Sequence, residues 1–435
     1  MLHISDRNKI TAIMRLMPIR IEKRKPIVTA LTCLLLSVCL LTGIHGMEGK
    51  AMAATTGNVS YTVKSTDDPV DKQYQKRKTY NTKSKNYYML RSYLELLERK
   101  GGGTLILSAG TYEICNTLYV ASNITILLKD GVVIRKSEDT GTESMKSSFS
   151  LFQLVAPTKA KIPGVYSAYN GESGIRLQGE GNATIDLNYV SGAIGIIFAH
   201  NSGISVRGIT FTNMQSGHFI ELDASRNVII EDNTFTGHKP SRSGIKEAIN
   251  LDTPDLRTGG IHVGWTSYDQ TPNLEVVIRN NRFSNLERAI GTHKYSEGKY
   301  HENIQILNNT IENTESDAIR IINWRTPTIT GNTISNVKEG SGTERAILAS
   351  GLIHPNIRDN VFQNVARPIQ LMPWKNNGAG GEYNITYNEV DFSEIELMLM
   401  NFLEQVREPF IRVNQVHNVF NTSTLKYYYS SEYKR

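Results

Sequence analysis

Short apolar segments typical of β-strands recur along this chain at a nearly fixed spacing, and this repeat constrains the fold most strongly. Aligning one segment type places isoleucines in a single column, with successive members 29, 41, 29, 28 and 22 residues apart. A second segment type ends in a turn with its own asparagine column, and asparagine tolerates left-handed backbone and can bond its stacked copy. A period of about 22–29 residues predicts an all-β fold, a right-handed single-stranded parallel β-helix. The columns are Ile220, Ile249, Ile290, Ile319, Ile347 and Ile369, and Asn285, Asn313, Asn336 and Asn364.

The segments on either side of the repeat set the expected domain boundaries. Apolar residues at helical spacing over 87–100, stopped by three glycines at 101–103, predict an amphipathic helix that caps the N-terminal end. We expect a polar linker over 54–84, the β-helix over 85–392 and a C-terminal cap of helix and strand over 393–435. The 41-residue step contains an insertion, 253–273, which we expect to overhang one face.

The positive charge is concentrated near the N-terminus. The chain has 48 Lys+Arg and 42 Asp+Glu, a formal net charge of +6. A basic cluster at 23–25, an apolar run at 27–41 and small residues at 51–53 predict a signal peptide over 1–53. An uncleaved membrane anchor is the alternative, although the apolar run is short for a membrane span.

Removing the predicted leader changes what the charge implies. The remaining chain has 40 basic and 39 acidic residues, which removes the main support for a nucleic-acid partner. Cys115 is then the single cysteine, so an intrachain disulfide is excluded. We expect a secreted, extracellular bacterial protein, monomeric and without stable membrane association after cleavage, whose partner is a polysaccharide.

Several segments resemble a known superfamily. Residues 101–137, with their glycine-rich turn and GTY sequence, resemble the opening of the pectate lyase-like β-helix superfamily. Residues 194–235 and 318–324 are similar to polygalacturonase-type glycoside hydrolases, and the resemblance covers about 85–390. Arg320 and Ile321 match the Arg-Ile of that family's substrate-binding strand, whose following lysine is Ile322 here.

The family's full catalytic set of aspartates is absent from this chain. Its catalytic positions hold an aspartate, an aspartate pair and a histidine, and these match His218, Lys246 with Glu247, and Arg288. The resemblance therefore implies a carbohydrate-active β-helix rather than that family's inverting hydrolysis. The superfamily also includes calcium-dependent pectate lyases, other uronate lyases, epimerases, and non-catalytic tailspike and adhesin domains.

Strand alternation predicts a candidate site independently of any family. With the isoleucines inward, the fourth and sixth residues of each aligned segment point to solvent. On adjacent coils these positions are Glu221, Asp223, Asn250, Asp252, His293 and Arg320. The edges of this patch are formed by Glu247, Arg288, Lys294, Tyr295 and Asp317.

The stacking of Asp223 on Asp252 needs a physical explanation, because like charges directly opposite each other are destabilising. A bridging Ca²⁺, a shared proton, or a structural network with Arg320 or Lys294 would each provide one. Calcium is the one cofactor that this pattern suggests, with Asp223 and Asp252 as its ligands.

Three functions remain open for this patch. A polysaccharide lyase or epimerase acting on a uronic-acid glycan would use His293, Lys294 or Tyr295 as base. A glycoside hydrolase would take its carboxylate pair from Glu247, Asp252 and Asp223. A non-catalytic glycan-binding protein is the third possibility. The predicted catalytic residues are Glu247, Asp252, His293 and Arg320, and the predicted substrate-binding residues are Glu221, Arg288, Lys294, Tyr295, Asp317 and Trp265.

Overall fold

The computed structural model describes residues 59–241, 243–261, 263–375, 383–414 and 425–428. All of them belong to one compact unit, 54–435. The predicted signal peptide, 1–53, lies outside the described residues. Among the described residues, no helix is both long enough and apolar enough to cross a membrane.

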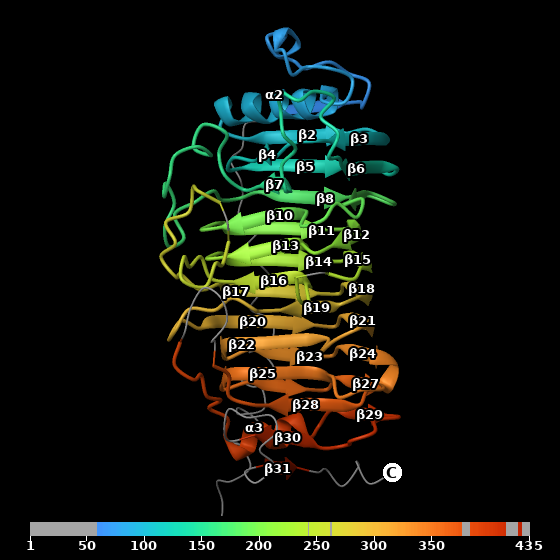
Figure 1. Cartoon of the computed structure of the whole chain (residues 1–435), viewed down its shortest axis with the longest axis vertical. Coiled ribbons are helices and arrows are strands. Elements are labelled where there is room, and N and C mark those ends of the chain that lie inside the picture. Colours follow the sequence, from blue (N-terminus) through green and yellow to red (C-terminus); the bar gives the residue numbers. More distant parts are fainter. Residues whose placement is uncertain (1–58, 242, 262, 376–382, 415–424, 429–435) are drawn as a thin grey trace, which may run out of the picture. The chain divides into compact units, whose positions relative to one another are not determined.

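The strands stack coil upon coil in two long sheets (Figure 1). Their pairings are parallel apart from the last, in which β30 and β31 run antiparallel. The larger sheet contains β1 (Ser60–Val63), β2 (Gly103–Leu107), β4 (Leu118–Tyr119), β5 (Ile124–Leu128), β7 (Ser150–Gln153), β8 (Arg176–Gly179), β10 (Ile194–Ala199), β11 (Ser202–Arg207), β13 (His218–Asp223), β14 (Arg226–Glu231), β16 (Glu247–Asp252), β17 (Leu274–Arg279), β19 (Arg288–Gly291), β20 (His301–Leu307), β22 (Ile319–Arg325), β23 (Thr328–Thr330), β25 (Arg345–Ile353), β26 (Asn356–Arg358), β28 (Arg367–Leu371), β30 (Ile411–Asn414) and β31 (Leu425–Tyr428). The other sheet contains β3 (Gly110–Ile114), β6 (Val132–Lys136), β9 (Thr184–Asp186), β12 (Thr210–Gln215), β15 (Thr234–Lys239), β18 (Arg282–Leu286), β21 (Thr310–Thr314), β24 (Thr333–Val337), β27 (Val361–Gln363) and β29 (Phe402–Glu404).

The isoleucine column sets the register of the coils, and the predicted parallel β-helix is confirmed. Ile220 pairs with Ile249, which pairs with Ile290, and the column continues in register to Ile369. All six isoleucines are buried inside the coil. Aromatic side chains stack in the same way, with the rings of Phe211, Phe235 and Phe283 successively 4.9 and 4.8 Å apart.

Asparagine ladders hold the turns of the coils. In the predicted turn column, Asn313 donates to Asn285 at 3.3 Å and Asn364 donates to Asn336 at 2.8 Å, and all four have positive φ. A second, fully buried ladder was not predicted. In it the side-chain amide of each asparagine donates to the side-chain oxygen of the next, at 2.8–3.1 Å, through Asn233, Asn281, Asn309, Asn332, Asn360 and Asn401.

The N-terminal end corrects one predicted boundary. Helix α2 (Lys85–Arg99) packs on the first coils as the predicted cap. The segment before it is not a polar linker where the structure describes it, because β1 pairs with β2 and a 3₁₀ turn, η1 (Tyr74–Lys76), follows. Val63 and Tyr74 are buried there. The segment completes the open edge of the first coil, which would otherwise leave backbone groups unpaired.

The C-terminal segment continues the coil and adds a helix. Helix α3 (Phe392–Met398) begins with a capping box between Asp391 and Glu394. After it, β29 pairs with β27 and β30 pairs with β28, so both sheets gain one more strand. A short 3₁₀ turn, η2 (Lys338–Gly340), lies between β24 and β25.

Candidate functional site

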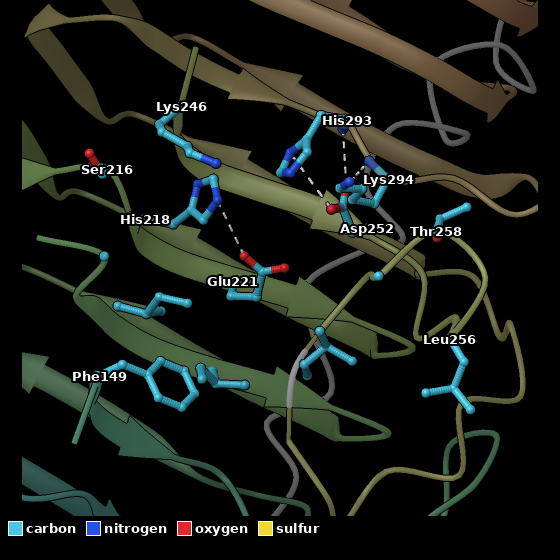
Figure 2. A pocket seen from close by; sticks show the side chains of 16 residues that line it. Phe149, Ser216, His218, Glu221, Lys246, Asp252, Leu256, Thr258, His293 and Lys294 are labelled. Carbon is cyan, nitrogen blue, oxygen red and sulfur yellow. Dashed lines mark hydrogen bonds and ion pairs between the residues drawn. The ribbon is translucent and has the colours of Figure 1, made fainter. Parts of the chain in front are cut away.

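A pocket of about 620 Å³ lies over strands β10, β13 and β16. Its polar lining comes from β13 and β16, from the residues just before each of them, from the insertion, and from the segment after β19 (Figure 2). The insertion 253–273 lies over this face, as the repeat spacing predicted, and contributes Leu256, Thr258, Gly259 and Ile261. The charged or ionisable side chains of the lining are His218, Glu221, Lys246, Asp252, His293 and Lys294.

The strand register places the predicted acidic columns together, but it does not leave them in solvent. Glu221 pairs with Asn250 and Asp223 pairs with Asp252 across β13 and β16, as predicted. The exposed fractions of Glu221, Asp223 and Asp252 are only 5%, 0% and 1%. The prediction that these positions point to solvent is therefore wrong.

Two irregular loops account for this burial. Ile261 and Trp265 from the insertion form an apolar cluster with Val155 and Tyr166 from an earlier loop, packed against Ile197 of β10. This cluster lies on the outer face of the sheet, so the face that strand alternation turns outward is covered by protein. Burial then controls the charge state of the acids beneath it.

Glu247 lies at the beginning of β16 and is held by cations. Its side chain is fully buried, Oε1 is 2.6 Å from Arg288 Nη1, and Oε2 is 3.2 Å from His293 Nδ1. Burial opposes ionisation, but His293, Arg288 and His218 outweigh it and hold the pKa of Glu247 well below its usual value. Glu247 is therefore a fixed anion that orients its neighbours, and it is not among the side chains that line the pocket.

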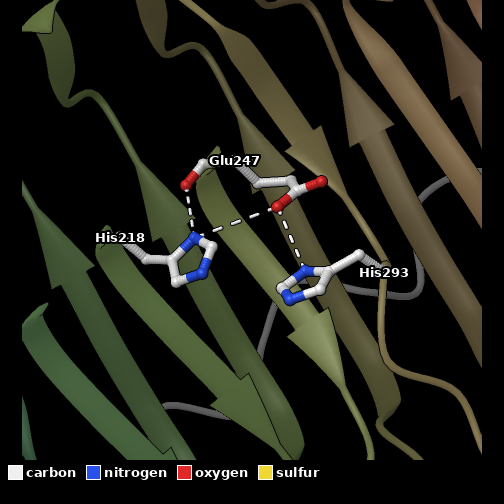
Figure 3. A group of neighbouring side chains, drawn as sticks. All are labelled: His218, Glu247 and His293. Atoms are coloured by element: carbon white, nitrogen blue, oxygen red, sulfur yellow. Dashed lines mark hydrogen bonds and ion pairs between the residues drawn. The ribbon is translucent and has the colours of Figure 1, made fainter. Parts of the chain in front are cut away.

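His218 and His293 share this anion and differ in charge (Figure 3). Their rings stack with centroids 5.5 Å apart. The Nδ1 of His218 donates to the Glu247 backbone carbonyl at 2.7 Å, so its Nε2 is an acceptor, 3.6 Å from Glu221 Oε2. Burial lowers the pKa of His218 to about 3, and the ring is neutral at neutral pH.

His293 is the charged partner of the pair. Its Nδ1 lies 3.0 Å from Asn250 Oδ1, an acceptor, which leaves the Nε2 proton for a ligand. Burial opposes the imidazolium, but Asp252 and Glu247 outweigh burial and raise the pKa of His293 to about 9.

The three acids of the predicted patch have unequal environments. Burial, with repulsion from Asp252, raises the pKa of Glu221 to about 8, while Asn250 Nδ2 donates to its Oε1 at 3.0 Å. Burial, with Glu221 and Asp252 nearby, raises the pKa of Asp223 well above its usual value. Neither carboxyl oxygen of Asp223 has a hydrogen-bond partner among the described residues.

The donor set around these acids favours a proton over a metal ion. Asp252 Oδ1 accepts the backbone N–H groups of His293 and Lys294 at 3.0 and 2.9 Å, and these donors oppose a cation at the same oxygen. Calcium requires six to eight oxygen ligands. Calcium between Asp223 and Asp252 therefore stays a prediction, and no step described below uses it.

A second group of possible ligands, His218, Glu247 and His293, has donor atoms that all lie within 4.8 Å of one another. However, the two imidazole planes are only 24° apart, so their in-plane lone pairs run side by side rather than converging on one point. The arrangement fits a carboxylate held between two rings better than a metal centre.

Three predicted residues lie outside the pocket lining, and two of them, Arg288 and Asp317, belong to an ion network. Arg288 contacts Glu247 and lies 3.7 Å from Asp317, whose carboxylate also binds Arg345 at 2.9 Å. Arg320 is buried, its guanidinium lies 4.9 Å from the Trp374 ring, and burial lowers its pKa to about 9. The structure therefore places Arg288, Asp317 and Arg320 beside the site, with no side chain in the pocket.

Two predicted sugar-binding aromatics have no face available for stacking. Trp265 is 2% exposed, and its indole nitrogen donates to Gln153 at 2.8 Å. Tyr295 is 1% exposed and packs against Tyr383, with centroids 5.7 Å apart. Both side chains are part of the packing of the covering loops, and their contact with substrate stays a prediction.

Sequence reasoning did not include several pocket residues in the candidate site. His218 and Lys246 had been aligned with family positions, and their place at the start of two stacked strands was the available signal. Phe149 and Ile194 carried no chemical signal, although both line the pocket.

Comparison with known proteins identifies relatives of a large part of the coil. The family described as "Right handed beta helix region" matches residues 116–334. Plasmin and fibronectin-binding protein A of Streptococcus pneumoniae is 22% identical over 282 residues, which are 60% of this chain. The chain spans only 38% of that relative's length.

Two solved structures of PfbA, a surface adhesin of Streptococcus pneumoniae, have the same fold. One has a TM-score of 0.54 and 18% identity, and covers 75% of this chain and 76% of that chain. The other has a TM-score of 0.53 and 17% identity, and covers 74% and 82%. At these identities the likeness concerns the fold alone, and it agrees with the resemblance found in the sequence.

Proposed function

This chain belongs to the right-handed β-helix family, and on that premise we propose that its pocket binds a uronic-acid glycan and abstracts the C5 proton of the sugar. The outcome is β-elimination, or epimerisation if the proton returns from the opposite face. One observation carries the proposal: an acid with a pKa of about 8, Glu221, and an imidazolium with a pKa of about 9, His293, line the same pocket.

The charges of the lining support an anionic sugar. Lys246, Lys294 and the imidazolium of His293 contribute three positive charges to the pocket wall, whereas Asp252 is held by two backbone N–H groups. A uronate carboxylate bound by the lysines would have part of its charge neutralised. This neutralisation makes the adjacent C5–H more acidic and lowers the barrier to its removal.

The proton transfers follow from the two raised pKa values. In its ionised form Glu221 takes the C5 proton, and the electrons of that C–H bond form the C4–C5 double bond. The bond from C4 to its glycosidic oxygen breaks, and His293 Nε2–H protonates the departing oxygen. Both groups have pKa values near the working pH, as effective acid–base catalysis requires. His218 Nε2, an acceptor 3.6 Å from Glu221 Oε2, faces the protonated form of Glu221 before it loses its proton.

A pH profile of the reaction tests this assignment. The active form needs Glu221 ionised and His293 protonated, so activity should rise as pH passes about 8 and fall as pH passes about 9. Uronate polysaccharides are incubated with the protein at pH 5–10, and new double bonds are followed by ultraviolet absorbance. Glu221→Gln should abolish the signal, whereas Glu339→Gln, an exposed change in η2, should leave it intact. Full activity of Glu221→Gln would refute the proposal.

Hydrolysis is a second candidate, favoured by the presence of Glu221 and Asp252 in one pocket. Protonated Glu221 would act as the general acid and ionised Asp252 as the second carboxylate, following the usual division between two carboxyl groups. Activity would then fall as pH rises through about 8, opposite to the first candidate. Reducing ends would also appear without absorbance from double bonds.

The relative in Streptococcus pneumoniae supports a surface location and a binding role without catalysis, because its name describes binding of plasmin and fibronectin. We propose that this chain also acts outside the cell or at its surface. Glycan binding without either product across the pH range would favour the non-catalytic function.

A further inference from the structure

The pocket has an apolar half that acid–base chemistry does not use. In Figure 2, Phe149 lies across Glu221 from His293 and Lys294, and Leu256 lies near Thr258 on the insertion. Phe149 is 42% exposed and Leu256 is 74% exposed. The apolar lining consists of Phe149, Ile194, Ile197, Leu256 and Ile261.

The strand register fixes the distance between the two halves. Ile194 of β10 pairs with His218 of β13, and Ile197 pairs with Glu221. Adjacent paired strands are about 4.8 Å apart. Ile194 therefore lies beside His218 and Ile197 beside Glu221, one coil toward the N-terminal end, and a sugar next to the reacting uronate would lie on this side of the pocket.

The chemistry of this neighbouring position discriminates between sugars. A bare sugar would direct hydroxyl groups against aliphatic side chains that offer them no hydrogen bond, which costs free energy. A sugar that carries an acyl methyl group would instead bury apolar surface against Ile194 and Phe149, which is favourable.

We propose that the apolar half is a subsite for an acetylated sugar residue, and that the protein selects acetylated uronic-acid glycans. This inference rests on the proposed function only for the position of the uronate. The charged side of the pocket, formed by Lys246, His293 and Lys294, would not create this preference for acetylated sugars. Lysine and histidine side chains recognise the carboxylate in acetylated and deacetylated chains alike.

Equilibrium binding tests the subsite without requiring turnover. O-acetylated polymannuronate oligosaccharides, and the same sample after mild alkaline deacetylation, are titrated into Glu221→Gln protein by calorimetry. We expect the acetylated form to bind about three- to tenfold more tightly. Phe149→Ala, introduced in the same background, should reduce this ratio toward one. Phe402→Ala, which removes a ring 58% exposed on β29, is the matched control and should preserve it.

The outcomes separate this inference from the proposed function. Equal affinity for the two forms, or a preference unaffected by Phe149→Ala, overturns the subsite even if the wild-type protein cleaves both. An acetyl preference in a protein that forms no product overturns the proposed reaction and supports the subsite. Binding of neither form overturns the subsite.

Discussion

The protonated carboxyl group of Glu221 stabilises the folded β-helix, and this contribution to the folding free energy should decrease as the pH rises. Its pKa is about 8 in the folded pocket, whereas its ordinary value is 4.5. The folded state therefore binds a proton more tightly than the unfolded state. The stabilisation that results is fully present below about pH 4.5 and is lost as pH rises toward 8.

The size of the effect follows from the same two values. Each pH unit between them changes the folding free energy by about 1.4 kcal/mol, so raising the pH from 5 to 8 removes about 4 kcal/mol through this carboxyl group. Glu221→Gln keeps the side-chain oxygen that accepts from Asn250 and cannot ionise. The variant should therefore lose this share of the pH dependence and exceed the wild type in stability at pH 8.

Urea unfolding at pH 5, 6, 7 and 8, followed by circular dichroism, measures this dependence. The difference in unfolding free energy between Glu221→Gln and wild type should grow steadily across the series. Glu339→Gln, an exposed carboxyl group in η2, should follow the wild type at each pH. Parallel curves for Glu221→Gln and wild type would show that Glu221 is already ionised in the folded pocket, and the reasoning on its burial would fail.

Three further substitutions test the structural network around the site. Arg288→Met leaves the buried Glu247 carboxylate without its 2.6 Å partner and should cost about 3–5 kcal/mol in thermal unfolding; a loss below 1 kcal/mol would contradict this pairing. Asn309→Ala removes a ladder residue and its bond to the Ile278 carbonyl, and about 2–4 kcal/mol should be lost, whereas an unchanged midpoint would refute the ladder's role. Trp265→Phe should lower stability by about 1–3 kcal/mol through its bond to Gln153 while leaving oligosaccharide affinity unchanged; a large loss of affinity would restore its predicted contact with sugar.

The fold was predictable because the repeat contains its own register. An isoleucine column at one position per coil fixes which residues pair, and Ile220, Ile249 and Ile290 pair as the alignment required. The same register correctly placed Asp223 beside Asp252. Neighbour relations within a solenoid are thus readable from sequence, since each coil contacts only the adjacent coils.

Burial at the site was not predictable in the same way. The loops that cover Glu221 and Asp252 have no periodic pattern, and their packing depends on contacts such as that of Trp265 with Tyr166, 99 residues apart in sequence. Strand alternation predicts which face of the sheet a side chain occupies, but it gives no information on which loops cover that face. The predicted solvent-facing patch is therefore an open pocket with buried acids, and Trp265 and Tyr295 pack within the covering loops.

His218 is neutral and His293 is protonated, and the sequence alone could not predict this difference. Both are histidines beside Glu247, with 7% of the His218 side chain and 27% of the His293 side chain exposed. His218 has no second carboxylate as strongly coupled to it, so burial dominates and the ring is neutral. His293 faces Asp252 as well as Glu247, and the two anions outweigh burial. The difference depends on a few ångströms of side-chain placement.

Concentrating acids in this pocket costs stability, and the coil contains the means to offset it. Asp223 is fully buried, neither of its oxygens has a hydrogen-bond partner in the described part of the chain, and it lies in register with Asp252. Elsewhere on the same coils, the ladder from Asn233 to Asn281 satisfies its buried amides from one coil to the next, and the Phe235 and Phe283 rings stack at 4.8 Å. These repeated contacts fix the spacing of the strands, so the acids cannot move apart to relieve their repulsion. Their pKa values are raised instead, and a raised pKa of Glu221 is what the proposed chemistry requires.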